Sequence, residues 1–261
     1  MITAFLGKGG VGKTSIASAN ALKCARQGKT LIVSTDFMPS LKHIFREEVE
    51  NLEVMELSEK EVASRWKERY GEQVTTVLKE FFDVDDWILD HIASSPGVAE
   101  EFMISNIFDL HDTGKYRNIV WDTAASSSTM HLLYLEREFY EHLDRDIRIY
   151  LRLKHRFRLS GAYEVLEEWK ALANSVWRGL LKINMYLVTT EDELSLIQAD
   201  EIEKDLGDMG MTFRGRIYNR CAEPILERKD GAASIPELEG SAVEIAKSII
   251  PYINTICEGE L

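Results

Sequence analysis

A glycine-rich loop near the start of the chain carries the residues best suited to chemistry. Residues Gly7 to Thr14 read G-K-G-G-V-G-K-T and fit the pattern G-x-x-x-x-G-K-[ST], which binds the phosphates of a nucleotide. Glycines let successive backbone N–H groups approach an anion without a Cβ in the way. The apolar segment Ile2–Leu6 precedes the loop and a helical pattern follows it, which is the context that the motif requires. The loop therefore predicts a site for ATP with Mg²⁺.

The side chains of this loop have distinct expected roles. Lys13 can reach the β- and γ-phosphates, and the Thr14 hydroxyl is the expected direct ligand of Mg²⁺. The helix that begins at the loop adds the positive end of its dipole to the anion site. The residues expected to bind the nucleotide here are Gly7, Lys8, Gly9, Gly10, Val11, Gly12, Lys13, Thr14 and Ser15.

Two carboxylates follow apolar segments that predict strands. Asp36 comes after the segment Thr30–Thr35, and Asp122 ends the segment Asn118–Asp122. A doubly wound sheet binds its ligand at the carboxyl ends of its strands, so both side chains are expected at the phosphate site. We expect Asp122 to hold the Mg²⁺ shell through water and Asp36 to orient or deprotonate the attacking water. Either carboxylate alone would more often be a helix cap, and it is the loop that favours the catalytic interpretation.

The rest of the chain must position these groups. Short apolar segments alternate with amphipathic helical patterns, which is typical of a mostly parallel sheet covered by helices. The expected strands are Ile2–Leu6, Thr30–Thr35, Leu52–Leu57, Asn118–Asp122, Asn184–Thr190 and Phe213–Asn219. Residues 58–115 and 129–181 interrupt this alternation with helical patterns alone. We expect one α/β domain over residues 1–261, with a P-loop NTPase fold and a helical subdomain inserted through those two segments.

Three segments outside the loop have more than one interpretation. The apolar stripe within 162–180 fits core packing and also a client-binding groove. The basic run 145–158 fits a solvated helix face and also a contact with an anion or partner. The stretch 242–256 is amphipathic but has little basic charge, which favours packing on the sheet over binding to lipid.

The composition limits the partners. A net charge of −13 disfavours broad binding to nucleic acid or anionic lipid. No apolar run approaches the length of about 18 residues that a membrane span needs, and the motif follows the N-terminus too closely for a signal peptide, so we expect a cytoplasmic protein. Cys24, Cys221 and Cys257 form no C-x-x-C pair and are interpreted as free thiols, with a metal shared between subunits as the alternative.

Lys8 gives the loop a resemblance to one class of ATPases. A second lysine in K-G-G-V-G-K-T marks the deviant Walker A motif of the class that includes the MinD, ParA, nitrogenase iron-protein and ArsA families. In proteins that resemble it, this lysine crosses a dimer interface to the partner's phosphates, where it acts like an arginine finger. The resemblance implies catalytic roles for Lys8, Lys13 and Asp36, and an ATP-dependent homodimer. A lysine that is only solvated in the loop is the alternative.

Further segments resemble the ArsA family, which includes the arsenite-pump ATPase and the ATPase that targets tail-anchored membrane proteins. Residues 35–41, T-D-F-M-P-S-L, are similar to its first switch, T-D-P-A-H-S-L, and residues 122–124, D-T-A, begin a segment similar to its second. Asn219 resembles the asparagine that recognises adenine in this class. Residues 37–39 and 125–128 depart from the family pattern, and the C-x-x-C that binds zinc in targeting members is absent from the sequence. The resemblance therefore implies a divergent, single-domain relative.

Several functions remain open at this point. The leading hypothesis is a homodimeric ATPase switch that binds and releases a protein or cofactor client at its helical surface, without stable membrane insertion or nucleic-acid binding. A metallocentre-assembly ATPase would need metal at the dimer interface, and a MinD- or ParA-like positioning ATPase would bind membrane or DNA. A scaffold without activity would need a broken motif, yet the sequence retains Lys8, Lys13, Thr14, Asp36 and Asp122.

Overall fold

The chain divides into two compact units in the computed structural model. One unit contains residues 1–56, 109–130 and 181–261, and the other contains residues 57–108 and 131–180. The structure describes residues 1–36, 40–79, 85–95, 98–124, 129–135, 137–138, 145, 162–211, 213–222, 231–253 and 256. Cys257, both divergent switch segments and all of the basic run except Arg145 lie outside these residues.

A seven-stranded sheet forms the centre of the first unit, and all its neighbouring strands pair in parallel. The strand order is β3-β2-β4-β1-β5-β6-β7. The strands are β1 Ile2–Leu6, β2 Thr30–Ser34, β3 Leu52–Glu56, β4 Asn118–Asp122, β5 Asn184–Thr189, β6 Phe213–Cys221 and β7 Gly231–Pro236. The residues of β1, β2 and β4 are all buried, as expected for central strands covered on both faces. The prediction of an α/β fold with a parallel sheet is confirmed.

The ends of some strands differ from the prediction. β6 continues to Cys221, beyond the predicted end at Asn219, because its last residue still pairs with β7 at Pro236. The strand β7 is not among the predicted strands. Its sequence, G-A-A-S-I-P, contains a single bulky apolar residue, Ile235, so no apolar run marks it as a strand.

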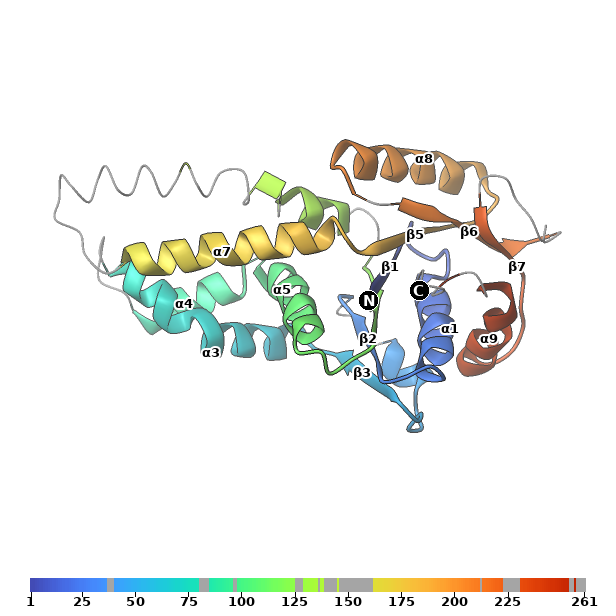
Figure 1. Cartoon of the computed structure of the whole chain (residues 1–261), viewed down its shortest axis with the longest axis horizontal. Helices are drawn as coiled ribbons and strands as arrows, with labels where there is room; N and C mark the ends of the chain where they lie inside the picture. The colour runs from blue at the N-terminus through green and yellow to red at the C-terminus, as the bar shows by residue number, and fades with distance from the viewer. Residues whose placement is uncertain are drawn as a thin grey trace. The chain divides into compact units, whose positions relative to one another are not determined.

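Helices cover both faces of this sheet (Figure 1). The helix α1 (Lys13–Ala25) packs against α9 (Ala242–Ile249) on one face, and α8 (Glu193–Asp208) lies on the other. The core beneath α1 and α9 receives one side chain from each of six strands: Phe5, Ile32, Val120, Val188, Ile217 and Ile235. The C-terminal stretch joins this core through α9 and a 3-10 turn, η1 (Ile250–Ile253), which confirms the prediction that it packs on the sheet.

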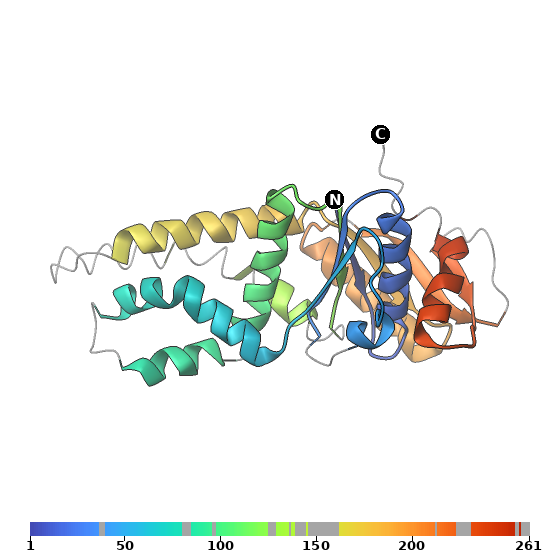
Figure 2. The ribbon, with the colours of Figure 1, turned by 90° about the horizontal axis from the view of Figure 1, so that it is seen from below.

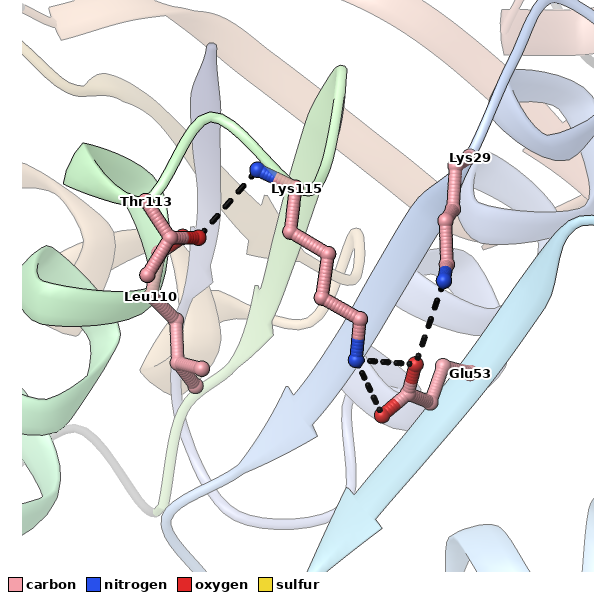
Figure 3. A network of polar contacts seen from close by, with 5 residues as sticks. All are labelled: Lys29, Glu53, Leu110, Thr113 and Lys115. Atoms are coloured by element: carbon pink, nitrogen blue, oxygen red, sulfur yellow. Dashed lines mark hydrogen bonds and ion pairs between the residues drawn. The ribbon is translucent and has the colours of Figure 1, made fainter.

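An ion-pair network joins the starts of three neighbouring strands at the amino end of the sheet (Figure 3). The Lys115 ammonium, just before β4, lies 3.2 and 3.0 Å from the two carboxylate oxygens of Glu53 on β3. Lys29, just before β2, lies 4.0 Å from the same carboxylate. The hydrogen bond from Lys115 lowers the pKa of Glu53. Because these side chains are exposed, the network contributes little to stability, and it marks the end of the sheet away from the loop.

The second unit is helical. The helices bounded in the described part of this unit include α3 (Glu59–Leu78), α4 (Asp86–Ala93), most of α5 (Val98–Asp112) and α7 (Ala162–Leu180). A capping box between Ser58 and Glu61 begins α3. In Figure 2, α3 and α4 run side by side in opposite directions and α7 packs against α3. No helix among the described residues is long and apolar enough to span a bilayer.

The packing of α7 against α5 gives the first testable prediction. A Cβ added at Gly179 on α7 would lie 2.4 Å from Cε1 of the Phe108 ring on α5, so Gly179→Ala must displace a buried ring. We expect this substitution to lower the free energy of unfolding by about 1–3 kcal/mol, as overpacking does. Urea unfolding followed by circular dichroism measures the change.

Gly207→Ala is the matched control. Gly207 is also a helical glycine, on α8, but a Cβ there would meet nothing within 4 Å. Alanine in that place should stabilise the helix by about 0.5–1 kcal/mol through its higher helix propensity. Equal effects of the two substitutions would show that the contact between Gly179 and Phe108 does not limit packing.

Candidate active site

The glycine loop lies between β1 and α1, and neighbouring strands hold it in place. Gly7 has a φ of +146°, and a Cβ there would lie 2.1 Å from the carbonyl oxygen of Val188 on β5. Gly12 has a φ of +97°, and a Cβ there would lie 2.3 Å from the side-chain nitrogen of Asn219 on β6. Only glycine combines these backbone angles with such close approach, so the loop conformation depends on both residues.

Lys13 curls back over the loop. Its Nζ donates hydrogen bonds to the carbonyl oxygens of Gly7 (2.9 Å) and Lys8 (3.1 Å). Burial lowers the pKa of Lys13, and the carboxylates of Asp122 and Asp36 oppose that shift. The structure thus brings Lys13 within electrostatic reach of both predicted carboxylates, beside the loop that would hold the phosphates.

Asp122 is a buried carboxyl group at the carboxyl end of β4. It is 1% exposed, and burial raises its pKa to about 7 even though the Thr14 hydrogen bond and the Lys13 charge both lower it. Among the groups that the structure describes, nothing hydrogen-bonds to its Oδ1. A buried carboxylate oxygen with spare acceptor capacity, next to a hydroxyl, is a donor set that suits Mg²⁺.

The chemistry of these donors therefore fits a magnesium ion that arrives with the nucleotide. Thr14 and Asp122 supply a hydroxyl and a carboxylate, both hard oxygen ligands, and Mg²⁺ usually takes its other ligands from phosphates and water. Within the described residues there is no cluster of three or more His, Cys, Asp or Glu side chains that could hold a metal ion without such help.

Asp36 lies just past the end of β2. Its backbone N–H donates to the Ser34 hydroxyl (3.2 Å), and its charge acts on Lys13 and on Asp122. Its side chain is partly exposed, whereas that of Asp122 is buried. The two carboxylates predicted from the sequence therefore share one edge of the sheet, with the more exposed one placed where water can reach it.

Asn219 lies against the loop. Its side chain is 6% exposed and donates a hydrogen bond from Nδ2 to the carbonyl oxygen of Val11 (2.8 Å). The resemblance implies an adenine contact for this residue. The hydrogen bond to Val11 joins the end of β6 to the backbone of the loop.

Lys8 is half-buried in the same loop. Hydrogen bonds from Ser195 and Thr190 hold the pKa of Asp192, the N-cap of α8, well below its usual range, and the Lys8 charge adds to this effect. Lys8 is therefore within electrostatic reach of Asp192 on its own chain, and the part of the side chain that is exposed is accessible to a partner.

One further buried carboxylate near the site is not among the predicted residues. Glu56, at the carboxyl end of β3, is 7% exposed, and its carboxylate accepts hydrogen bonds from the backbone N–H groups of Ser40 (2.6 Å), Leu41 (3.0 Å) and Lys42 (3.1 Å). It thereby caps the short helix α2 (Leu41–Ile44), which begins at the last residue of the first switch. Its position as a carboxylate at the end of an apolar segment, like Asp36 and Asp122, is the signal that could have identified it.

The helical unit contains a separate apolar cavity of about 390 Å³. Side chains from α3, α4, α5 and α7 line it, among them Trp66, Tyr70, Val74, Phe102, Trp169 and Leu172. In the apolar stripe predicted on α7, Ala173, Val176 and Leu180 are buried. Trp169, Leu172, Ala173 and Val176 line the cavity.

Comparison with known proteins supports the nucleotide site. The model of the anion-transporting ATPase family, ArsA, matches residues 1–176. A putative arsenical pump-driving ATPase 2 of Aquifex aeolicus is 27% identical over 95% of this chain and 91% of its own length. A putative arsenical pump-driving ATPase of Halobacterium salinarum is 29% identical over 95% of this chain but only 40% of its own length. An ATPase ASNA1 homolog of Plasmodium vivax is 24% identical over 84% of this chain and 63% of its own length.

The raised pKa of Asp122 gives a prediction for the protein without nucleotide and metal. The native state keeps this proton up to a pH of about 7, whereas the unfolded chain releases it near pH 4. Asp122 therefore contributes stability that is present in acid and is lost as the pH rises through this window. Asp122→Asn should remove that loss. Between pH 4 and pH 8, the free energy of unfolding of the variant should therefore rise, relative to that of the parent, by on the order of a few kcal/mol.

Urea unfolding of both proteins across this pH range, in the presence of a chelator, measures the difference. Asparagine has nearly the same shape as aspartate and retains an oxygen that can accept from Thr14, so the comparison isolates the ionisation. A difference in stability that stays constant with pH would contradict the assignment of a raised pKa to this carboxyl group.

Proposed function

We propose that this chain, which belongs to the ArsA family of anion-transporting ATPases, is a Mg²⁺-dependent switch that hydrolyses ATP as a homodimer. The ATPase activity follows from membership of the family. What we propose is the role of each site residue, the formation of the dimer and the binding of a client. The observation that carries it is the grouping of Lys13, Thr14, Asp36 and Asp122 at the carboxyl edge of the sheet, beside the glycine loop.

Within one chain, the loop and its neighbours would bind and orient the triphosphate. The backbone N–H groups of Gly9 to Ser15 would hold the phosphates, and Lys13 would exchange its loop carbonyls for phosphate oxygens. Thr14 and Asp122 would hold Mg²⁺, which when bound neutralises the charge that develops on the phosphates. Asp36 would accept a proton from the attacking water or orient it, and Asn219 would contact the base.

The second subunit would complete the site through Lys8. The deviant motif contains this lysine in addition to Lys13, whose ammonium group is already engaged with the loop. A cation placed in trans on the transferred phosphate is worth roughly 10³–10⁵ in rate in comparable enzymes. ATP would favour the closed dimer, and hydrolysis would relax it.

Mixing two inactive variants tests the trans role. Asp36→Asn should still bind ATP but lose most of its turnover, and Lys8→Ala should lose turnover as well. In a mixed dimer, the site on the Lys8→Ala chain has its own Asp36 and receives Lys8 from the partner subunit. We therefore expect a 1:1 mixture to recover about a quarter of the parent ATPase rate, because about half of the dimers are mixed and each has one intact site.

Three outcomes would contradict parts of this scheme. A mixture no more active than the separate variants, with mixed dimers demonstrated by cross-linking, would place Lys8 in cis. An Asp36→Asn protein that hydrolyses ATP at the parent rate would remove Asp36 from the catalytic role. A dimer that forms equally with and without nucleotide would contradict the ATP-dependent switch.

We place the client at the apolar cavity of the helical unit. Its lining is almost entirely aromatic and aliphatic, and such a cavity at a surface is typical of a binding site for apolar groups. A volume of about 390 Å³ suits a few apolar side chains of a client helix rather than an entire membrane-spanning segment. A metallocentre-assembly or positioning ATPase has no comparable feature to support it in the described part of the chain.

A labelled peptide with a helical apolar segment tests the client site. Leu172→Asp places a charge in the cavity lining, and we expect it to weaken peptide binding by about tenfold or more, as burial of an unpaired charge does. Fluorescence anisotropy measures the affinity. Ile197→Asp is the control, because Ile197 is 47% exposed on α8 and lies outside the cavity. Equal binding by both variants and the parent would exclude the cavity as the client site.

A further inference from the structure

A buried hydrogen bond joins the two residues that precede the predicted catalytic carboxylates. The indole N–H of Trp121 donates to the Thr35 hydroxyl at 3.0 Å. Trp121 is 1% exposed and Thr35 is 3% exposed, so water does not compete for either group. Trp121 lies immediately before Asp122, and Thr35 lies immediately before Asp36.

A second hydrogen bond connects the same two segments through the backbone. The N–H of Thr35 donates to the carbonyl oxygen of Asp122 at 3.2 Å. Regular pairing between β2 and β4 ends one residue earlier, at Ser34 and Asp122. Beyond that pair, Thr35 is held to β4 by these two bonds, one from its backbone and one at its side chain.

We propose that Trp121 and Thr35 are positioning residues that set the distance between Asp36 and Asp122. This inference rests on the proposed function, in which Asp36 acts on the attacking water and Asp122 holds the Mg²⁺ shell. Together with the backbone bond, this side-chain hydrogen bond fixes Thr35 beyond the last regular pair of β2 and β4, and the peptide that follows Thr35 carries Asp36. A shift of Thr35 therefore moves the base relative to the metal site without removing either carboxylate.

The hydroxyl of Thr35 and the indole of Trp121 are both needed for this link. A phenylalanine in place of Trp121 would fill most of the same space but could not donate. A valine in place of Thr35 has nearly the same shape as threonine but could not accept, and it would leave the indole N–H buried without its partner. A serine would retain the hydroxyl.

A double-mutant cycle with Trp121→Phe, Thr35→Val and the combination tests the link. Small displacements of catalytic groups lower rates by about 10–100-fold, so we expect such a loss of kcat from each single variant while the KM for ATP stays within about threefold. The double variant should be no slower than the slower single variant, because both changes break the same bond. Thr35→Ser should retain kcat within about threefold of the parent.

Controls separate this role from a structural one. Each variant is compared with the parent by thermal unfolding, and Trp177→Phe, a change of the same type at a buried residue of α7 that does not line the apolar cavity, should leave kcat unaltered. If Trp121→Phe does not fold, Thr35→Val and Thr35→Ser alone provide the comparison. Folded variants with the parent kcat, or losses that multiply in the double variant, would overturn the inference. An Asp36→Asn variant with the parent kcat would instead refute the proposed function on which the inference rests.

Discussion

The pairing of β4 between β1 and β2 is the constraint on which the site depends. Asp122 is in register with Phe5 of β1 on one side and with Ser34 of β2 on the other. The glycine loop therefore begins just beyond the first of these partners, and Asp36 lies just beyond the second. Three segments that are far apart in the sequence reach the same edge because parallel strands end together.

The same arrangement buries the carboxyl group of Asp122, and its ionisation there costs free energy unless a cation is bound. Asp36 and Glu56 both raise the pKa of the buried Asp122, while the hydrogen bond from Thr14 and the charge of Lys13 lower it. Desolvation outweighs these stabilising contacts, so the carboxyl group of Asp122 keeps its proton up to a pH of about 7. A bound cation would reverse that preference and release the proton, and binding of metal and nucleotide would then stabilise the fold itself.

Local features made most of the fold and much of the site predictable from sequence. The loop is a contiguous motif, and the buried strands that precede it and end at Asp122 are contiguous apolar runs. The missed features arise from contacts in space. Glu56 caps α2 because its carboxylate accepts hydrogen bonds from the backbone at the start of that helix. The strand β7 forms because its backbone pairs with β6, although its sequence contains no apolar run. The contact of Asn219 with Val11 likewise joins residues that no spacing rule relates.

The glycine loop is already shaped for its ligand, but Lys13 makes hydrogen bonds within it. Close contacts at Gly7 and Gly12 fix its path against β5 and β6, so binding need not order the backbone and avoids that entropic cost. The hydrogen bonds of Lys13 to two loop carbonyls have the opposite effect, because they must be given up before the ammonium can reach a phosphate. A charged phosphate oxygen is a stronger acceptor than a carbonyl, so the exchange favours the ligand. The two loop carbonyls thus stabilise the buried ammonium group of Lys13 until a phosphate replaces them.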